Sequence, residues 1–330
     1  MSETKDLAVQ FVAPQAAKLV ELEPDRRPLA PNEVAGRTLV SLISPGTELA
    51  AYQGLWPGAK MPFGCGYAAV FSVEQVGTEI KDLREGDLAF CMGNHRSLQR
   101  HERQSVVRLP EGLEPQVAVF ARMMGVTMST LVTTTARPPD IVVVTGLGLI
   151  GNLGAQVFQA CGYAVVGCDP SPPRRDLAKR CGICDVRERA PVDDASLAGQ
   201  VGLVLECSGH EQAVLDGCRI VRKRGEVVLV GSPWRRRADL QAFDVLHAIF
   251  RRYVILRSGW EWELPDHPTD FRSGSLFGNF AGAMEWLREG RIRVKDLADV
   301  RNPHQAQEAY QALLAGTEAR LTTLFDWRQR

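Results

Sequence analysis

The sequence predicts an α/β fold in which a doubly wound parallel sheet is inserted into a mostly antiparallel β domain. Residues 37–125 hold short apolar runs separated by turn residues, such as those of SPGTE and REGD. From residue 126 to 271, strand-like runs alternate with helical stretches, which is typical of a parallel sheet with helices on both faces. After residue 271, two helical stretches lead to a final apolar run. We therefore expect residues 1–125 and 272–330 to form one domain and residues 126–271 to form the other.

Each element is predicted from a run of apolar or β-branched residues that ends at turn residues. The strands of the first domain are expected at TLVSLI (38–43), AAVFSVEQV (68–76), DLAFCM (87–92) and SVVRL (105–109). The strands of the second domain are expected at IVVV (141–144), AVVGC (164–168), GLVLEC (202–207), EVVLV (226–230) and YVILRS (253–258). Helices are expected at 279–290 and 304–316, and the apolar run LTTLFDW (321–327) is predicted to return to the first domain.

The composition is that of an ordinary globular protein without marked charge. Of its 330 residues, 45% are hydrophobic and 24% charged, and 39 basic residues balance 39 acidic ones. This balance gives no indication of a nucleic acid or an anionic membrane as partner. No apolar stretch reaches about 18 residues, and the N-terminus lacks the pattern of a signal peptide. We therefore expect a cytoplasmic protein that acts on a small molecule and keeps its eight cysteines reduced.

The most specific motif is Gly146-x-Gly148-x-x-Gly151, which follows the apolar strand at 141–144 and opens a helix. This context makes it a dinucleotide-binding fingerprint. The first glycine permits a tight turn, the second lets a pyrophosphate approach the backbone, and the third allows close packing of helix on strand. Leu149 and Ile150 complete the loop, and the helix N-terminus offers free N–H groups to the phosphates.

An acidic residue, Asp169, ends the second strand of this domain. At this position a carboxylate accepts hydrogen bonds from the ribose hydroxyls and repels a 2′-phosphate, so NAD(H) is favoured over NADP(H). Arg174 follows closely and is either a solvated helix residue or a group that holds such a phosphate. Cys207, Ser208 and Gly231 come at the ends of later strands, where the ligand crevice of an open parallel sheet lies. We expect them to line the nicotinamide side.

These motifs resemble those of the medium-chain dehydrogenase/reductase superfamily, which includes alcohol dehydrogenases and quinone reductases. SPGTELAAYQG is similar to the CGTDxxxxxG segment, FGCGYAAVFSVEQVG to GHExxGxVxxVG, and REGDLAF to the GDRV turn. TGLGLIG, LECSG and GEVVLVG resemble three segments of its nucleotide domain. The resemblance implies a GroES-like β domain built from both chain ends, an inserted Rossmann domain and, by analogy, a homodimer.

The departures from this pattern predict that the catalytic zinc is absent. Pro45 stands where zinc-containing members have a cysteine ligand, Tyr67 replaces a histidine ligand, and Ala68 replaces the glutamate that follows it. The segment 121–130, where the third ligand usually falls, contains no Cys, His, Asp or Glu, and the four-cysteine zinc lobe is also missing. The remaining route to a metal is a rebuilt site from residues whose spacing matches no known pattern: Cys65, Cys91, His95 and His101.

Without a metal, hydrogen-bond donors must stabilise the reacting oxygen. The candidates are Tyr67, Thr47 and His95, although Thr47 could simply cap a turn, Tyr67 line a pocket and His95 belong to a loop. A phenol with a pKa of about 10 is a donor near neutral pH, which slightly favours carbonyl reduction. Glu48 is expected to orient a neighbour. Trp56 and Trp260 are expected to border the substrate pocket, although simple packing explains them equally well.

The leading hypothesis is a zinc-independent, NAD(H)-dependent oxidoreductase that transfers hydride between nicotinamide and a carbonyl/alcohol substrate. An enoyl or quinone reductase of the same superfamily is the first alternative. A non-catalytic NAD(H)-binding protein that has lost its metal is the second, and a zinc alcohol dehydrogenase the third. The three arginines at 235–237 form either a solvated loop or a site for an anionic substrate group.

Overall fold

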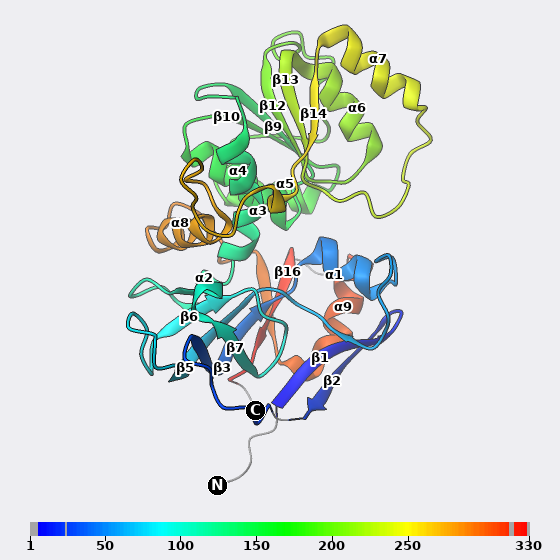
Figure 1. Cartoon of the computed structure of the whole chain (residues 1–330). Helices are drawn as coiled ribbons and strands as arrows, with labels where there is room; N and C mark the ends of the chain where they lie inside the picture. The colour runs from blue at the N-terminus through cyan, green and yellow to red at the C-terminus, as the bar shows by residue number, and fades with distance from the viewer. Residues whose placement is uncertain (1–5, 24, 317–319, 329–330) are drawn as a thin grey trace. The chain divides into compact units, whose positions relative to one another are not determined.

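The computed structural model describes residues 6–23, 25–316 and 320–328, which form two compact units (Figure 1). In their described parts, the first unit consists of Met1–Arg122, Phe280–Glu289 and Val294–Arg330, and the second of Met123–Asn279 and Gly290–Arg293. The chain passes from one unit to the other within helices α3 (Ala121–Thr133) and α8 (Leu276–Arg288). The expected boundaries lie a few residues away, because a change in composition does not mark the point at which a continuous helix leaves a unit.

A seven-stranded sheet forms the centre of the first unit. Its order is β15-β16-β3-β5-β6-β8, with β7 also paired to β3. These strands are β3 (Glu33–Leu42), β5 (Ala69–Val76), β6 (Leu88–Cys91), β7 (Leu98–Glu102), β8 (Val106–Arg108), β15 (Ala298–Arg301) and β16 (Thr322–Asp326). Strand β16 runs antiparallel to β3, with Leu324 opposite Leu42. The C-terminal apolar run therefore returns to the first domain, as predicted.

A smaller sheet in the first unit was not predicted. It contains β1 (Asp6–Ala13), β2 (Ala16–Leu22) and β4 (Phe63–Gly64), in the order β2-β1-β4. Helices α1 (Pro45–Tyr52) and α9 (Ala306–Ala315) contribute to a shared buried core with this sheet. That core contains Val9, Phe11, Ile43, Tyr52, Tyr310 and Phe325. Because large buried aromatic side chains fix their neighbours firmly, this core holds α1, which carries Thr47 and Glu48, in place.

The second unit contains a six-stranded parallel sheet. Its strands, in spatial order, are β11 (Asp185–Arg187), β10 (Ala164–Cys168), β9 (Ile141–Thr145), β12 (Val201–Glu206), β13 (Val221–Leu229) and β14 (Ile255–Ser258). Val142 and Val144 of β9 belong to one buried cluster and Val143 to another. Since successive strand residues point to opposite faces, both faces are covered, and the prediction of a doubly wound sheet is confirmed.

The order of the strands places a ligand crevice in this sheet. Strand β9 has β10 on one side and β12 on the other, so the winding direction reverses beside β9. In open parallel sheets, ligands bind at the carboxyl ends of the two strands that flank such a reversal. Among the described helices, none combines the length and the hydropathy needed to cross a bilayer.

Candidate active site

The glycine loop after β9 has the geometry of a phosphate-binding turn. Gly146 has φ +83°, and a Cβ at this position would lie 2.8 Å from the Ser208 backbone nitrogen. A Cβ on Gly151 would lie only 1.8 Å from the Gly146 carbonyl oxygen, so this helix residue must remain glycine. Gly148 is the N-cap of α4 (Leu149–Ala160) and has no atom within 4 Å of its would-be Cβ. The helix therefore presents its first N–H groups beside open space, which fits a pyrophosphate.

Asp169 lies at the end of β10, next to this loop. Its carboxylate accepts a hydrogen bond of 2.8 Å from the Leu147 N–H and another of 2.8 Å from the Ser171 N–H. Arg174 of α5 (Pro172–Arg180) places its Nη1 3.5 Å from the Asp169 carboxylate and is 52% exposed. Asp169 thus holds the glycine loop in position, while Arg174 is free to turn toward solvent.

The carboxyl end of β12 is organised by Glu206. Its carboxylate accepts hydrogen bonds from the Ser208 hydroxyl, from the Ser208 N–H at 2.8 Å and from the Gly209 N–H at 3.0 Å. The Gly231 N–H donates to the Glu206 carbonyl at 2.7 Å, and a Cβ on Gly231 would lie 2.5 Å from the Gly209 nitrogen. Burial raises the pKa of Glu206, and the hydrogen bonds from Ser208 and Gly209 oppose this rise. The structure therefore brings Ser208 and Gly231 beside the crevice, next to half-buried Cys207.

In the first unit, Tyr67 lies among three polar side chains. Its hydroxyl donates to the Ser44 hydroxyl. The Arg122 guanidinium carbon lies 4.7 Å from the centroid of the Tyr67 ring. Burial raises the pKa of Tyr67, whereas the Arg122 charge and hydrogen bonding to Ser44 and Thr47 act in the opposite direction. Tyr67 is therefore a neutral phenol near pH 7, and Thr47, the other candidate from this part of the sequence, lies beside it.

Arg122 was not predicted from the sequence, because its contact with Tyr67 joins segments that are distant in the chain. It lies in the first turn of α3 and is 3% exposed. Its guanidinium also lies 5.5 Å from the centroid of the Phe280 ring. The signal that could have identified it is a single cationic residue in an otherwise apolar and hydroxyl-bearing run, since a buried arginine needs a partner.

A second polar cluster lies entirely inside the first unit. The Glu48 carboxylate accepts a hydrogen bond from the Ser44 N–H at 2.7 Å and from the Tyr310 hydroxyl at 2.5 Å, and it lies 3.0 Å from His95 Nε2. His95 is 0% exposed and its Nδ1 lies 2.8 Å from the Ser41 hydroxyl. Glu48 therefore orients its neighbours. His95, which was predicted as a catalytic candidate, does not reach the surface of its unit.

The protons of this cluster can be assigned without conflict. The Trp327 indole N–H donates to the Ser41 hydroxyl at 2.9 Å, which leaves the Ser41 hydrogen free for His95 Nδ1. His95 then carries its proton on Nε2 and donates it to Glu48. Position 66 requires glycine beside this ring. Gly66 has φ +89°, and a Cβ there would lie 2.6 Å from the His95 imidazole. Every polar atom of the cluster named here has a partner within the protein.

The rebuilt metal site that the sequence left open is not assembled as expected. Cys91 and His101 both contact Gln99, with distances of 3.7 Å and 3.0 Å to its side-chain oxygen. Cys65 and His95 do come together with Glu48, and the potential ligand atoms of these three buried residues lie within 4.8 Å of one another. This trio has donor types that suit zinc.

At the positions that the resemblance assigns to zinc, the residues do not fit a metal ion. Pro45 is the first residue of α1 and has no side-chain donor. Tyr67 offers only a phenol, and its ring is covered by the buried Arg122 guanidinium, whose charge opposes a divalent cation.

The remaining predicted residues lie at more exposed positions. Trp56 is 45% exposed and contacts Phe63 edge-on, with 6.5 Å between ring centroids. Trp260, which follows β14, is 70% exposed. Arg235–Arg237 form an exposed loop in which Arg236 pairs with Asp239.

Comparisons with known proteins agree with this architecture. The sequence pattern of the zinc-binding dehydrogenase family matches residues 149–262. The sorbitol dehydrogenase of Halalkalibacterium halodurans is 25% identical over 225 residues, which cover 56% of this chain and 65% of that enzyme. The alcohol dehydrogenase of Geobacillus stearothermophilus is 26% identical over 263 residues, which cover 66% and 78%. The structure of acetophenone reductase from Geotrichum candidum, in complex with NAD, matches with a TM-score of 0.80 at 15% identity, over 100% of this chain and 99% of that chain.

The chain is therefore similar in sequence to zinc-binding dehydrogenases over residues 149–262 and shares the fold of medium-chain dehydrogenases/reductases. The predicted combination of a GroES-like domain and a Rossmann domain is confirmed. The relatives named above are dehydrogenases and a reductase, which agrees with the expected NAD(P)-dependent dehydrogenase/reductase. The match to the zinc-binding family lies within residues of the second unit. It therefore does not include Pro45 or Tyr67, and it carries no information on a metal in the first unit.

Proposed function

We propose that this chain is a medium-chain dehydrogenase/reductase that works as a zinc-independent, NAD(H)-dependent oxidoreductase on a carbonyl/alcohol pair, with reduction slightly favoured. The observation that carries the proposal is the group around Tyr67, in which a neutral phenol lies beside two hydroxyls and a buried guanidinium. These are the donors that an oxygen needs when it gains negative charge without a metal.

The chemistry is a balanced two-electron reduction. A nicotinamide cofactor held at the glycine loop would supply the hydride to the carbonyl carbon. The electron pair of the C=O bond moves to oxygen, and the Tyr67 hydroxyl, released from Ser44, donates its proton there. Solvent then reprotonates Tyr67 through the half-buried Thr47. The sum is carbonyl, NADH and one proton in, and alcohol and NAD⁺ out.

In this proposal His95 is a positioning residue. His95 contacts the Glu48 carboxylate, which accepts a hydrogen bond from the Ser44 N–H. Ser44 is thereby held in place, and its hydroxyl accepts the hydrogen bond from Tyr67. Full burial of the imidazole argues against direct contact with a substrate.

The proposed zinc independence rests on two features. The Arg122 charge disfavours a cation beside Tyr67, and the Glu48–Cys65–His95 trio is already hydrogen-bonded within the protein. The proposed preference for NAD(H) rests on Asp169, whose negative charge opposes a 2′-phosphate.

A panel of aldehydes, ketones, quinones and enones, each tested with NADH and NADPH, examines the proposal. We expect NADH oxidation with at least one aldehyde or ketone, and a loss of about 100-fold in kcat in Tyr67→Phe. Turnover of quinones or enones alone would favour the alternative reductase. NADH binding without turnover of any compound would favour a non-catalytic binding protein.

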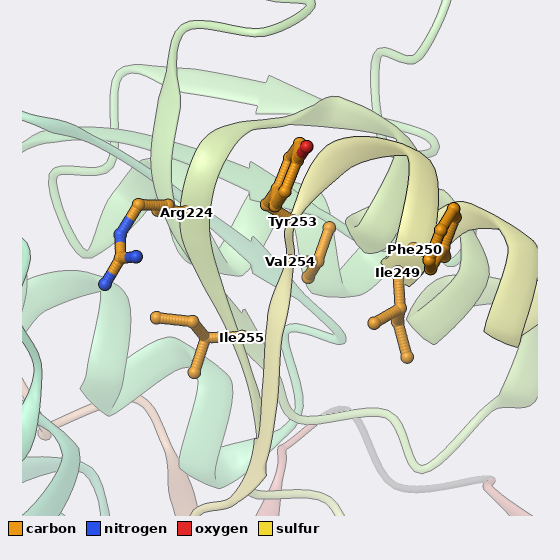
Figure 2. Close-up of a pocket in the computed structure, with 6 residues that line it drawn as sticks. All are labelled: Arg224, Ile249, Phe250, Tyr253, Val254 and Ile255. Atoms are coloured by element: carbon orange, nitrogen blue, oxygen red, sulfur yellow. The ribbon is translucent and has the colours of Figure 1, made fainter.

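We also propose that the protein is a homodimer that associates through α7 (Ala242–Arg252) and the edge strand β14. Phe243, Leu246 and Phe250 lie on one face of α7 and are 69%, 64% and 82% exposed. Figure 2 shows Phe250 and Ile249 of α7 with Tyr253 and Ile255 around a shallow pocket. A continuous exposed apolar surface beside an open sheet edge is typical of a protein interface. A second copy fits because two β14 edges related by a two-fold axis can pair with each other.

A further inference from the structure

Arg122 is a permanent positive charge inside the first unit. Arginine remains protonated at any physiological pH, and burying a charge costs free energy unless the surroundings compensate it. Here the guanidinium lies 4.7 Å from the centroid of the Tyr67 ring and 5.5 Å from that of the Phe280 ring. Ring faces carry negative potential and attract a guanidinium, most strongly where water is excluded. The protein therefore fixes this cation against the ring of the proposed proton donor.

We propose that Arg122 is a positioning residue for carbonyl reduction, and that it supplies through Tyr67 the positive charge that a metal would otherwise supply. This inference rests on the function proposed above. Negative charge develops on the substrate oxygen during hydride transfer and then on the Tyr67 oxygen as its proton leaves. A fixed cation against the same ring stabilises both stages, and a low-dielectric environment strengthens the effect.

The contact also fixes the direction of the phenol. Tyr67 is half-buried, and its ring is held by Arg122 on one side while its hydroxyl is held by Ser44. Correct orientation of a proton donor contributes to the rate because a small displacement lengthens the hydrogen bond to the reacting oxygen. Lysine would retain the charge but not the planar stacking surface. The two contributions can therefore be separated by substitution.

The test is a double-mutant cycle of Arg122→Met and Tyr67→Phe, with Arg122→Lys as the charge-retaining variant. Arg122→Met is expected to lower kcat by about 10- to 100-fold, with the KM for NADH changed less than about twofold, because the cofactor loop belongs to the other unit. Arg122→Lys should recover a large part of this loss. In the double variant, the Arg122 substitution should add less than about twofold, since a residue that acts through Tyr67 has no effect without it.

Three further measurements make the outcome decisive. Thermal unfolding and NADH fluorescence titration of each variant show whether the fold and the cofactor site are retained. If Arg122→Met does not fold, Phe280→Leu replaces it, because it removes one of the two ring contacts and keeps the charge; it should lower kcat to a smaller extent. An unchanged kcat in a folded Arg122→Met, or full additivity with Tyr67→Phe, overturns the inference. If Tyr67→Phe itself retains full activity, Tyr67 is not the proton donor and the inference fails with it, whereas a lack of NADH oxidation with every carbonyl compound would contradict the proposed function.

Discussion

His95 illustrates how a single buried residue can support a site that it does not enter. Both ring nitrogens have partners, Ser41 and Glu48, and neither side of the imidazole is exposed. We expect His95→Ala to lower the free energy of unfolding by about 2–4 kcal/mol, because it creates a cavity and removes one hydrogen bond from each of two buried groups, Ser41 and Glu48. Urea unfolding measures this loss. His101→Ala, which removes one hydrogen bond at a half-buried position, is the control and should cost less.

The same pair of variants tests the role that was first expected for His95. A His95→Ala protein that is as stable as the wild type but inactive would indicate direct participation in catalysis. A protein whose kcat falls in parallel with its stability agrees with positioning.

Two glycines of the cofactor loop give a matched comparison. Gly148→Ala places a Cβ in open space at the helix N-terminus, so we expect the melting temperature to change by less than about 2 °C and the Kd for NADH to rise about tenfold or more. Gly151→Ala forces a Cβ into the Gly146 carbonyl and should lower both stability and affinity. Calorimetry and NADH fluorescence measure the two quantities. Unchanged affinity in Gly148→Ala would place the phosphates elsewhere.

At the scale of elements, helix α7 carries a prediction about assembly. Val245, Ala248 and Ile249 of this helix pack against the core, whereas Phe243, Leu246 and Phe250 are exposed, so burial within the chain does not explain the second set. We expect Phe250→Asp to shift the protein from dimer to monomer in size-exclusion chromatography with light scattering, because a carboxylate opposes burial in an apolar interface. Phe271→Asp, at a position that is 103% exposed in a loop, is the matched control and should leave the dimer intact. A wild-type monomer would contradict the proposal.

At the scale of the whole molecule, the proposed zinc independence can be tested by direct metal analysis. We expect less than about 0.1 zinc per chain in the purified protein, and unchanged kcat after prolonged treatment with a chelator, since no step requires a Lewis acid. Elemental analysis by mass spectrometry gives the metal content. Zinc near one per chain, lost together with activity and lost also in His95→Ala, would identify Glu48, Cys65 and His95 as a metal site.

The sequence predicted the regular parts of the chain well. The strands at 141–144, 164–168 and 202–207 lie close to the observed β9, β10 and β12, because central parallel strands read as apolar runs between turns. The hairpin of β1 and β2 was missed because its strands mix polar with apolar residues. The glycine loop was predicted because each glycine meets a local backbone requirement, and such requirements are visible in a short sequence motif.

The first-unit site was less predictable because its contacts join distant segments. Tyr310 bonds to Glu48 across 262 positions of the chain, and His95 meets Glu48 across 47. Composition and periodicity do not predict which side chains come into contact over such distances along the chain. Arg122 was overlooked for the same reason, since its relation to Tyr67 exists only after α3 and the loop before β5 have folded.

By itself, the sequence determined the fold class, the cofactor loop and the lack of metal ligands at Pro45 and Tyr67, since these depend on local backbone and side-chain chemistry. Only the tertiary structure decided that His95 is buried against Glu48 and that a guanidinium covers the Tyr67 ring. The physical reason is that local preferences act between neighbours in the chain, whereas charge, burial and hydrogen-bond partners are set by neighbours in space.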